Sequence, residues 1–108
     1  MTRILVCSDI HANLTALEAV LWDAGKVDST WCLGDVVGYG PDPNECIDRL
    51  RSLPDLVCLI GNHDAAALGR LDIKSFNQEA RQSIRWLGST LTRKSRDFLA
   101  ALPETYID

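Results

Sequence analysis

Three short apolar runs, each followed directly by a polar loop, constrain the fold of this 108-residue chain most strongly. The runs occupy residues 3–7, 30–33 and 56–60. Apolar runs of this length that end in polar or glycine-rich segments are typical of buried strands. Residues 14–24 and 44–53, which lie between the runs, carry apolar side chains at helical spacing. The pattern therefore predicts three strands that alternate with two helices.

The alternation also predicts how the strands pair. Two strands joined by a helix-length connection pair in parallel through a right-handed crossover. Parallel pairing places the carboxyl ends of all three strands along one edge of the sheet, where open α/β folds bind ligands. We therefore expect an α/β fold with a parallel sheet of β-α-β units, in a single domain of residues 1–108. Residues 8–11, 34–40 and 61–64, at the ends of the three strands, should then be neighbours in space.

The remainder of the chain is expected to be mostly helical. Apolar side chains recur at helical spacing and predict helices over residues 77–87 and 93–102, after a single turn at residues 65–68. Residues 104–108 resemble the opening of a further strand that has no room to continue. We therefore expect an incomplete domain, the N-terminal part of a larger architecture.

The composition excludes several classes of protein. A hydrophobic content of 46% with 24% charged residues is that of an ordinary globular domain, so disordered and fibrous classes are excluded. The net charge of -4 provides no overall field that would attract nucleic acid or an anionic membrane. The apolar run at residues 4–7 is too short for a signal peptide or a membrane span. We expect a cytoplasmic protein without a membrane partner and without a strong nucleic-acid signal.

The four cysteines show no C-x-x-C spacing, which argues against a zinc ribbon or a redox pair of that type. Most of them lie within apolar runs. We expect reduced thiols that act as small core residues: Cys7, Cys32, Cys46 and Cys58.

The three predicted loops carry side chains that ligate metals or transfer protons: Asp9, His11, Asp35, Asn62, His63 and Asp64. The Asp9-x-His11 spacing brings a carboxylate oxygen and an imidazole nitrogen within reach of one cation, and Asp35 from the next loop can close a third side. The second oxygen of Asp35 can bridge to another cation about 3.5–4 Å away, the arrangement suited to phosphate ester hydrolysis by metal-activated water. Asn62 offers a neutral oxygen to that second ion.

Three blocks of this sequence resemble those of the calcineurin-like metallophosphoesterases. Asp9-Ile10-His11 is similar to the family's D-x-H block, Gly34-Asp35 to its G-D block, and Gly61-Asn62-His63-Asp64 to its G-N-H-D block. The blocks occur in the family's order, and the resemblance covers residues 3–64. The Gly-Tyr-Gly-Pro loop after the second block is most similar to the small bacterial and archaeal phosphodiesterase type. The resemblance implies the first half of an α/β-β/α sandwich.

The resemblance also implies roles for single residues. Asp9 and His11 would bind the first metal, Asp35 would bridge both metals, and Asn62 would bind the second. His63 would protonate the leaving oxygen or stabilise charge on the phosphoryl group, and Asp64 would orient its imidazole. Tyr39 is a candidate for substrate contact, with a packing role as the alternative. The implied cofactors are two divalent cations, manganese, iron, zinc or nickel, and ligand type does not fix their identity.

The chain departs from the family pattern in its histidines. The family has three further metal-binding histidines, two of them in a G-H-x-H block, whereas this sequence contains only His11 and His63. The second metal would keep two protein ligands, Asp35 and Asn62. The second sheet of the sandwich would be absent as well, so we expect one face of the first sheet to be exposed unless another copy of the chain covers it. Ala12 stands where many relatives have Gly, at a cost of about 1 kcal/mol if the backbone needs a positive φ.

Three functions remain open at this level. The first is a metal-dependent phosphoesterase that hydrolyses a phosphomonoester or phosphodiester. The second is a non-catalytic metal- or phosphate-binding fragment that lacks the later metal ligands. The third is a dinucleotide-binding domain, which the first loop disfavours because residues 8–13 are acidic and contain no Gly.

Overall fold

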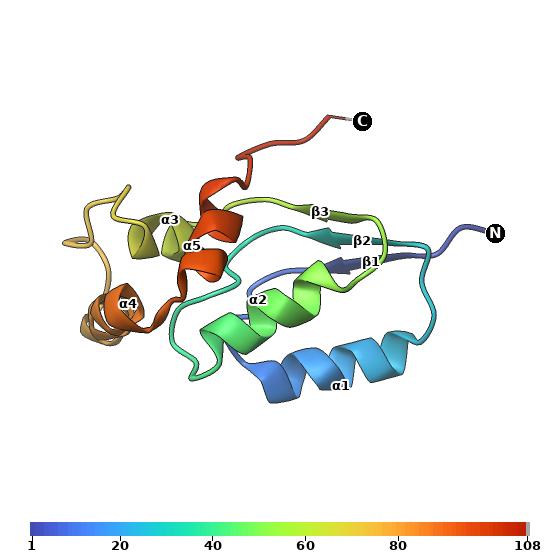
Figure 1. Ribbon diagram of the computed structural model, residues 1–108, viewed down its shortest axis with the longest axis horizontal. Helices are drawn as coiled ribbons and strands as arrows, with labels where there is room; N and C mark the ends of the chain where they lie inside the picture. Colours follow the sequence, from blue (N-terminus) through green and yellow to red (C-terminus); the bar gives the residue numbers. More distant parts are fainter. Residues whose placement is uncertain (108) are drawn as a thin grey trace.

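The three predicted strands form one parallel sheet in the order β1-β2-β3 (Figure 1). The computed structural model describes residues 1–107. The strands are β1 (Ile4–Cys7), β2 (Ser29–Cys32) and β3 (Leu56–Cys58), and the crossover helices are α1 (Leu14–Ala24) and α2 (Pro43–Arg51). The predicted β-α-β units and their parallel pairing are confirmed.

The ends of the crossover helices follow from local chemistry. The Asn13 side chain caps α1 by accepting a hydrogen bond from the backbone N–H of Ala16 at 3.0 Å. Helix α1 ends at Gly25, whose φ of 67° suits a residue without Cβ. Helix α2 begins one residue earlier than predicted, because Pro43 occupies its first turn, where a missing N–H costs nothing.

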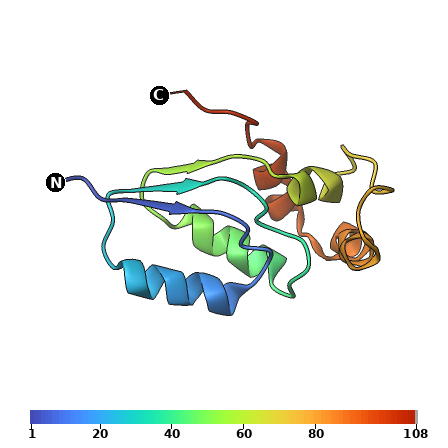
Figure 2. The ribbon, with the colours of Figure 1, turned by 180° about the vertical axis from the view of Figure 1, so that it is seen from behind.

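The other helices gather at the carboxyl edge of the sheet (Figures 1 and 2). They are α3 (Asn62–Ala67), α4 (Gln78–Thr90) and α5 (Arg93–Ala100). The predicted helices over 77–87 and 93–102 are confirmed within two or three residues. The turn predicted at residues 65–68 is a longer helix that begins at Asn62, so the residues of the third block lie on the first turn of α3 rather than in a loop.

The strand expected to open at residue 104 is not formed in the described part of this segment, residues 104–107. Asp108, the last residue of the expected strand, lies outside the described residues. The N–H of Ile60 bonds to the Pro103 carbonyl at 2.9 Å, and residues 104–107 after it form no strand. Tyr106 instead lines a cavity of about 170 Å³ together with Trp31 and Leu33.

The two faces of the sheet are covered unequally. Figures 1 and 2 show α1 and α2 on the same side of the sheet. The core lies on that side and is built mainly from strand and helix residues with almost no exposed surface: Cys32, Val36, Val37, Ile47, Leu50, Cys58, Leu87 and Leu99. On the other face, Val6 and Leu33 are each 53% exposed and Trp31 is 42% exposed. The expected open face is therefore present, and its coverage by a second copy stays a prediction.

No helix among residues 1–107 combines the length and the apolar character that crossing a membrane requires.

Candidate metal centre

The first two site loops are joined by a ladder of backbone hydrogen bonds beyond the ends of β1 and β2. The N–H of Asp9 bonds to the Gly34 carbonyl at 3.0 Å, and the N–H of His11 bonds to the Asp35 carbonyl at 2.9 Å. The N–H of Ala12 continues the ladder to Val36 at 2.8 Å. These bonds fix the two loops against each other before any ligand is present, which is how a rigid scaffold positions a site.

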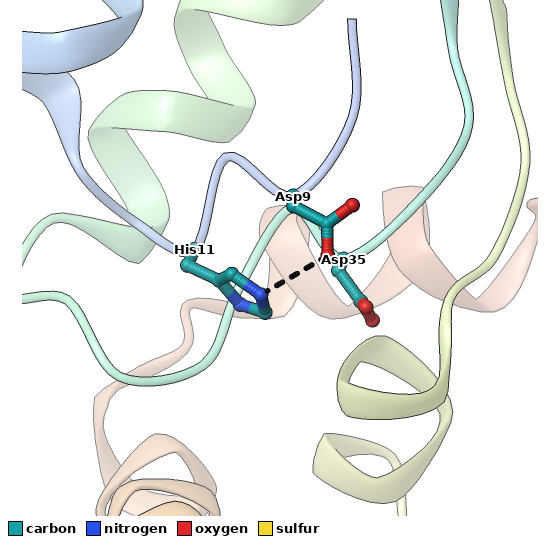
Figure 3. Close-up of side chains that lie close together, drawn as sticks. All are labelled: Asp9, His11 and Asp35. Atoms are coloured by element: carbon teal, nitrogen blue, oxygen red, sulfur yellow. Dashed lines mark ion pairs between the residues drawn. The ribbon is translucent and has the colours of Figure 1, made fainter.

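The ladder brings three ligand side chains together. Suitable atoms of Asp9, His11 and Asp35 all lie within 4.8 Å of one another (Figure 3). Nε2 of His11 lies 3.4 Å from Oδ1 of Asp9. Asp9 is exposed, whereas His11 and Asp35 are half-buried. Two carboxylates and one imidazole that converge in this way form a mixed oxygen and nitrogen donor set that suits a divalent transition metal.

The ring of His11 is oriented for ligation. Its Nδ1 lies 3.2 Å from the backbone carbonyl of Val37, an atom that can only accept a hydrogen bond. A proton on Nδ1 would donate to this carbonyl and would leave Nε2, which lies beside the Asp9 carboxylate, to bind a cation. Metal-binding histidines are commonly held by such a contact on their other nitrogen.

The charge of Asp9 is supported as well. The Ser8 hydroxyl donates a hydrogen bond to Oδ2 of Asp9 at 2.6 Å, and this bond holds the pKa of Asp9 below its usual value. Oδ1 remains beside His11. The carboxylate is thus ionised at neutral pH, the state that a cation requires.

The backbone of these loops is held in a sparsely populated conformation. Five non-glycine residues of these loops have left-handed φ angles: Asp9 (57°), His11 (48°), Ala12 (55°), Asp35 (55°) and Tyr39 (65°). Such residues typically cluster where a site needs a fixed geometry that the surrounding structure enforces. The positive φ anticipated for Ala12 is confirmed, and Ala12 is fully buried, so its methyl group cannot relax the strain by moving into solvent.

The third block joins the centre through Asp35. The N–H of His63 donates to Oδ1 of Asp35 at 3.0 Å, which anchors the start of α3 beside the ligand cluster. Asn62, the first residue of α3, is exposed. It lines a cavity of about 370 Å³ together with Asp35, His63 and Phe76. A second cation in this cavity would find a carboxylate and an amide oxygen from these residues.

The imidazole of His63 is packed among other rings. Its centroid lies 4.9 Å from that of His11, 5.0 Å from that of Tyr39 and 5.3 Å from that of Phe76. Its Nδ1 is buried and has no hydrogen-bond partner among residues 1–107. A Cβ on Gly38 would lie 2.5 Å from this nitrogen, so the glycine backbone seals it. Burial lowers the pKa of His63, and Nε2 is the nitrogen left to exchange a proton with a ligand.

Asp64 does not make the contact expected of it. Its Oδ1 accepts the N–H of Val37 and its Oδ2 accepts the N–H of Gly61, both at 3.0 Å, rather than orienting the imidazole of His63. The reason is its place in the first turn of α3, where a carboxylate satisfies the backbone N–H before the helix. Burial raises the pKa of Asp64 to about 6, against the opposing effect of these two hydrogen bonds. Asp64 therefore joins the second loop to the start of α3.

Tyr39 lies between two cavities. It lines the 370 Å³ cavity beside His63 and another of about 520 Å³ beside Asp9 and His11. Its N–H donates to Oγ of Ser83 at 2.6 Å, and its hydroxyl lies 3.3 Å from Nδ2 of Asn77. Helix α4 therefore positions Tyr39 beside both histidines. Sequence reasoning missed the contribution of Phe76, Asn77 and Ser83, because none of them belongs to a recognisable motif.

A comparison with protein families settles the assignment that this geometry suggests. A family model for calcineurin-like phosphoesterases matches residues 2–105. The chain belongs to this family. The resemblance carried by the three blocks is thereby confirmed.

Individual relatives agree with the family match. Protein MJ0912 of Methanocaldococcus jannaschii is 43% identical over 94% of this chain and 42% of its own length. The symmetrical bis(5'-nucleosyl)-tetraphosphatase of Pseudomonas fluorescens strain SBW25 is 49% identical over 44% of this chain and 17% of its own length. The chain thus spans less than half the length of the relatives it matches.

Solved structures show the same fold. A metallophosphoesterase from Sphaerobacter thermophilus superimposes with a TM-score of 0.84 at 50% identity, over 99% of this chain and 44% of that one. Protein PH1004 from Pyrococcus horikoshii superimposes with a TM-score of 0.74 at 19% identity, over 95% of this chain and 48% of that one. The second likeness is one of fold alone. The three-stranded parallel sheet thus corresponds to about half of a metallophosphoesterase structure.

Proposed function

We propose that this chain supplies the first metal site and the leaving-group histidine of a metal-dependent phosphoesterase, which hydrolyses a phosphomonoester or phosphodiester. The observation that carries the proposal is the convergence of Asp9, His11 and Asp35 within 4.8 Å, with the N–H of His63 on the same Asp35 carboxylate. Family membership supports hydrolase chemistry at this place in the fold.

The donor set fits a divalent cation. Asp9, Nε2 of His11 and Asp35 would hold the first ion, and Asp35 together with Asn62 would hold a second. The family's ions are manganese, iron, zinc or nickel. When bound, such ions polarise a phosphoryl oxygen and lower the pKa of a water molecule so that a nucleophile exists near neutral pH.

The remaining roles fall to protein groups beside the cluster. His63 lies on the side of the 370 Å³ cavity, so a leaving group in that cavity would meet Nε2 of His63. The low pKa of His63 favours a neutral ring whose Nε2–H donates to the leaving oxygen. Asp64 accepts the N–H groups of Val37 and Gly61 and so positions the second loop and the start of α3, while Tyr39 lines both cavities beside the cluster.

A second candidate function is favoured because the two metal sites would have unequal numbers of protein ligands. A second cation would have two ligands among the described residues, Asp35 and Asn62. Two protein oxygens make a weak metal site. A chain in this state would bind one cation or a phosphate group without turnover. The candidate functions therefore differ in whether a further set of ligands completes the centre.

The experiment compares the chain alone with a chimera in which residues 1–107 are joined to the second half of the Sphaerobacter relative. Each is assayed with bis(p-nitrophenyl) phosphate and p-nitrophenyl phosphate in Mn²⁺. We expect hydrolysis by the chimera and its loss in the chimera that carries Asp35→Asn. A folded chimera that binds Mn²⁺ but hydrolyses neither substrate would reject the phosphoesterase and favour the non-catalytic binding fragment.

A further inference from the structure

Three cysteines form a row across the sheet. The strand register pairs Cys7 of β1 with Cys32 of β2, and Cys32 with Cys58 of β3. The preceding row, Val6, Trp31 and Val57, belongs to the opposite face, because successive side chains on a strand point to opposite sides. All three thiols therefore lie on the helix-covered side, where Cys32 is 1% and Cys58 is 5% exposed.

The spacing of the row permits a bond between neighbours. Adjacent strands lie about 4.7–4.9 Å apart. A disulfide needs Cα atoms roughly 4.4–6.8 Å apart, so directly opposed cysteines on neighbouring strands meet this requirement. Cys7 and Cys58 are separated by β2 and do not. Since Cys32 is the shared neighbour, the row can hold one disulfide at a time.

The row is not built to share a metal ion. Among residues 1–107, the group of three or more ligand residues whose atoms all lie within 4.8 Å of one another is Asp9, His11 and Asp35. The three sulfurs do not form such a group, because they are spread along a line rather than around a point. The chemistry available to these thiols is therefore pairwise.

One end of the row is accessible to small molecules. Cys7 is half-buried and lines the cavity of about 520 Å³ whose wall also includes the exposed Asp9. Cys32 and Cys58 are buried. The fourth cysteine, Cys46, lies on α2 and is fully buried, and it has no place in the strand register. A small oxidant would reach Cys7 first.

We propose that Cys7 and Cys32 form a reversible intramolecular disulfide when the chain meets a peroxide. The Cys7 sulfur attacks one oxygen of hydrogen peroxide, the O–O bond breaks, and water leaves, which gives a sulfenic acid on Cys7. The Cys32 sulfur then attacks the sulfur of Cys7, the S–O bond breaks, and the hydroxyl leaves with the remaining thiol proton as water. Two thiols lose two electrons, and one peroxide is reduced to two waters.

The position of this bond connects it to the metal centre. Cys7 precedes Asp9 by two residues, and Cys32 precedes Asp35 by three. A disulfide would join β1 to β2 immediately before the two loops that carry the ligands. The proposed bond would therefore constrain the two strands just before the ligand loops, whereas Cys46 lies on α2, away from these strands.

The test treats the reduced, folded chain with hydrogen peroxide and analyses a tryptic digest by mass spectrometry without reduction. Cys46→Ala is used as the parent, because the tryptic peptide 27–49 otherwise contains both Cys32 and Cys46. We expect peptide 4–26 linked to peptide 27–49, loss of two thiols from each monomeric chain, and full reversal by dithiothreitol. Cys58→Ala in the same parent should form the same link.

Several results would overturn the proposal. They are a link between peptides 27–49 and 52–70 instead, a link between two chains on a non-reducing gel, and over-oxidation of Cys7 to sulfinic acid without any link. Cys7→Ala and Cys7→Ser should both abolish the link. The parent measurement decides the question even if one of these variants fails to fold.

Discussion

The ligands on the two sides of the candidate metal centre are held in place to different degrees. On one side, Asp9, His11 and Asp35 come from two loops that a ladder of backbone hydrogen bonds holds in register. On the other side, Asn62 stands exposed at the start of α3, and its block is joined to the cluster through the carboxylates of Asp35 and Asp64. Three donor side chains of this chain converge on the first side, whereas we expect Asp35 and Asn62 alone of the described residues to serve the second.

The difference follows from where the strands end. Parallel neighbours extend their hydrogen bonding past the last residue of each strand, so the β1 and β2 loops inherit the rigidity of the sheet. The third block leaves the sheet at once, because Ile60 bonds to Pro103 and α3 begins at Asn62. A metal ligand at the start of α3, such as Asn62, is therefore not held by the hydrogen bonds of the sheet.

The substitution Asp35→Asn should have the largest effect on the difference between the two sides of the centre. Asp35 contributes to both sides, so the substitution should weaken Mn²⁺ binding by about 100-fold or more, since a lost ligand costs at least as much as a lost supporting contact. Isothermal titration calorimetry of the folded variant measures the loss. Asp23→Asn, an exposed carboxylate on α1, is the matched control and should bind as the parent does. Equal affinity in both variants would contradict the assignment of Asp35.

The packing of His63 can be broken through a glycine. At Gly38 the φ is 102°, and an added Cβ would lie 2.5 Å from Nδ1 of His63, so Gly38→Ala should destabilise the fold by about 3 kcal/mol. Gly69→Ala has a comparable φ of 77° and open space around it, and it should cost about 1 kcal/mol. Urea unfolding compares them. Equal losses of unfolding free energy would mean that Gly38 is needed only for its positive φ and not for the space beside His63.

The substitution Asp64→Asn tests how strongly this carboxylate joins the second loop to the start of α3. One side-chain oxygen would become an NH₂ group facing a backbone N–H, which leaves a buried donor unpaired, so we expect a loss of about 2 kcal/mol in unfolding free energy. If Asp64 instead acted only on His63, stability would be unchanged. The unfolding midpoint in urea decides between the two.

The smallest effect is expected at Asn62. Because Asn62 belongs to the side that this chain leaves incomplete, Asn62→Ala should change the affinity for the first Mn²⁺ by less than about two-fold, within the range of a surface substitution. Calorimetry under the conditions used for Asp35→Asn provides the comparison. A loss as large as that of Asp35→Asn would show that both sides form one inseparable site.

Much of this asymmetry was visible in the sequence. The three apolar runs predicted the parallel sheet, and the spacing of Asp9, His11 and Asp35 predicted the cluster, because strand ends in a parallel sheet must meet at one edge. The histidine count, only His11 and His63, predicts a weak second metal site, and this stays a prediction. These features depend on local pattern and on topology, which a sequence carries directly.

Other features depended on contacts that no pattern records. Asp64 was expected to orient His63, yet two backbone N–H groups compete for its oxygens, and their positions are set by the fold. Phe76 reaches the centre because the segment before α4 turns back toward His63. The strand expected at residue 104 is not formed in residues 104–107, where Tyr106 lines a cavity together with Trp31 and Leu33.

We propose that the chain by itself holds one cation at Asp9, His11 and Asp35. The most direct measurement is the Mn²⁺ content per chain by elemental analysis after equilibrium dialysis, for the parent and for Asp35→Asn. We expect one ion per parent chain and none in the variant. A parent chain that binds no ion, or a variant that retains its ion, would contradict it.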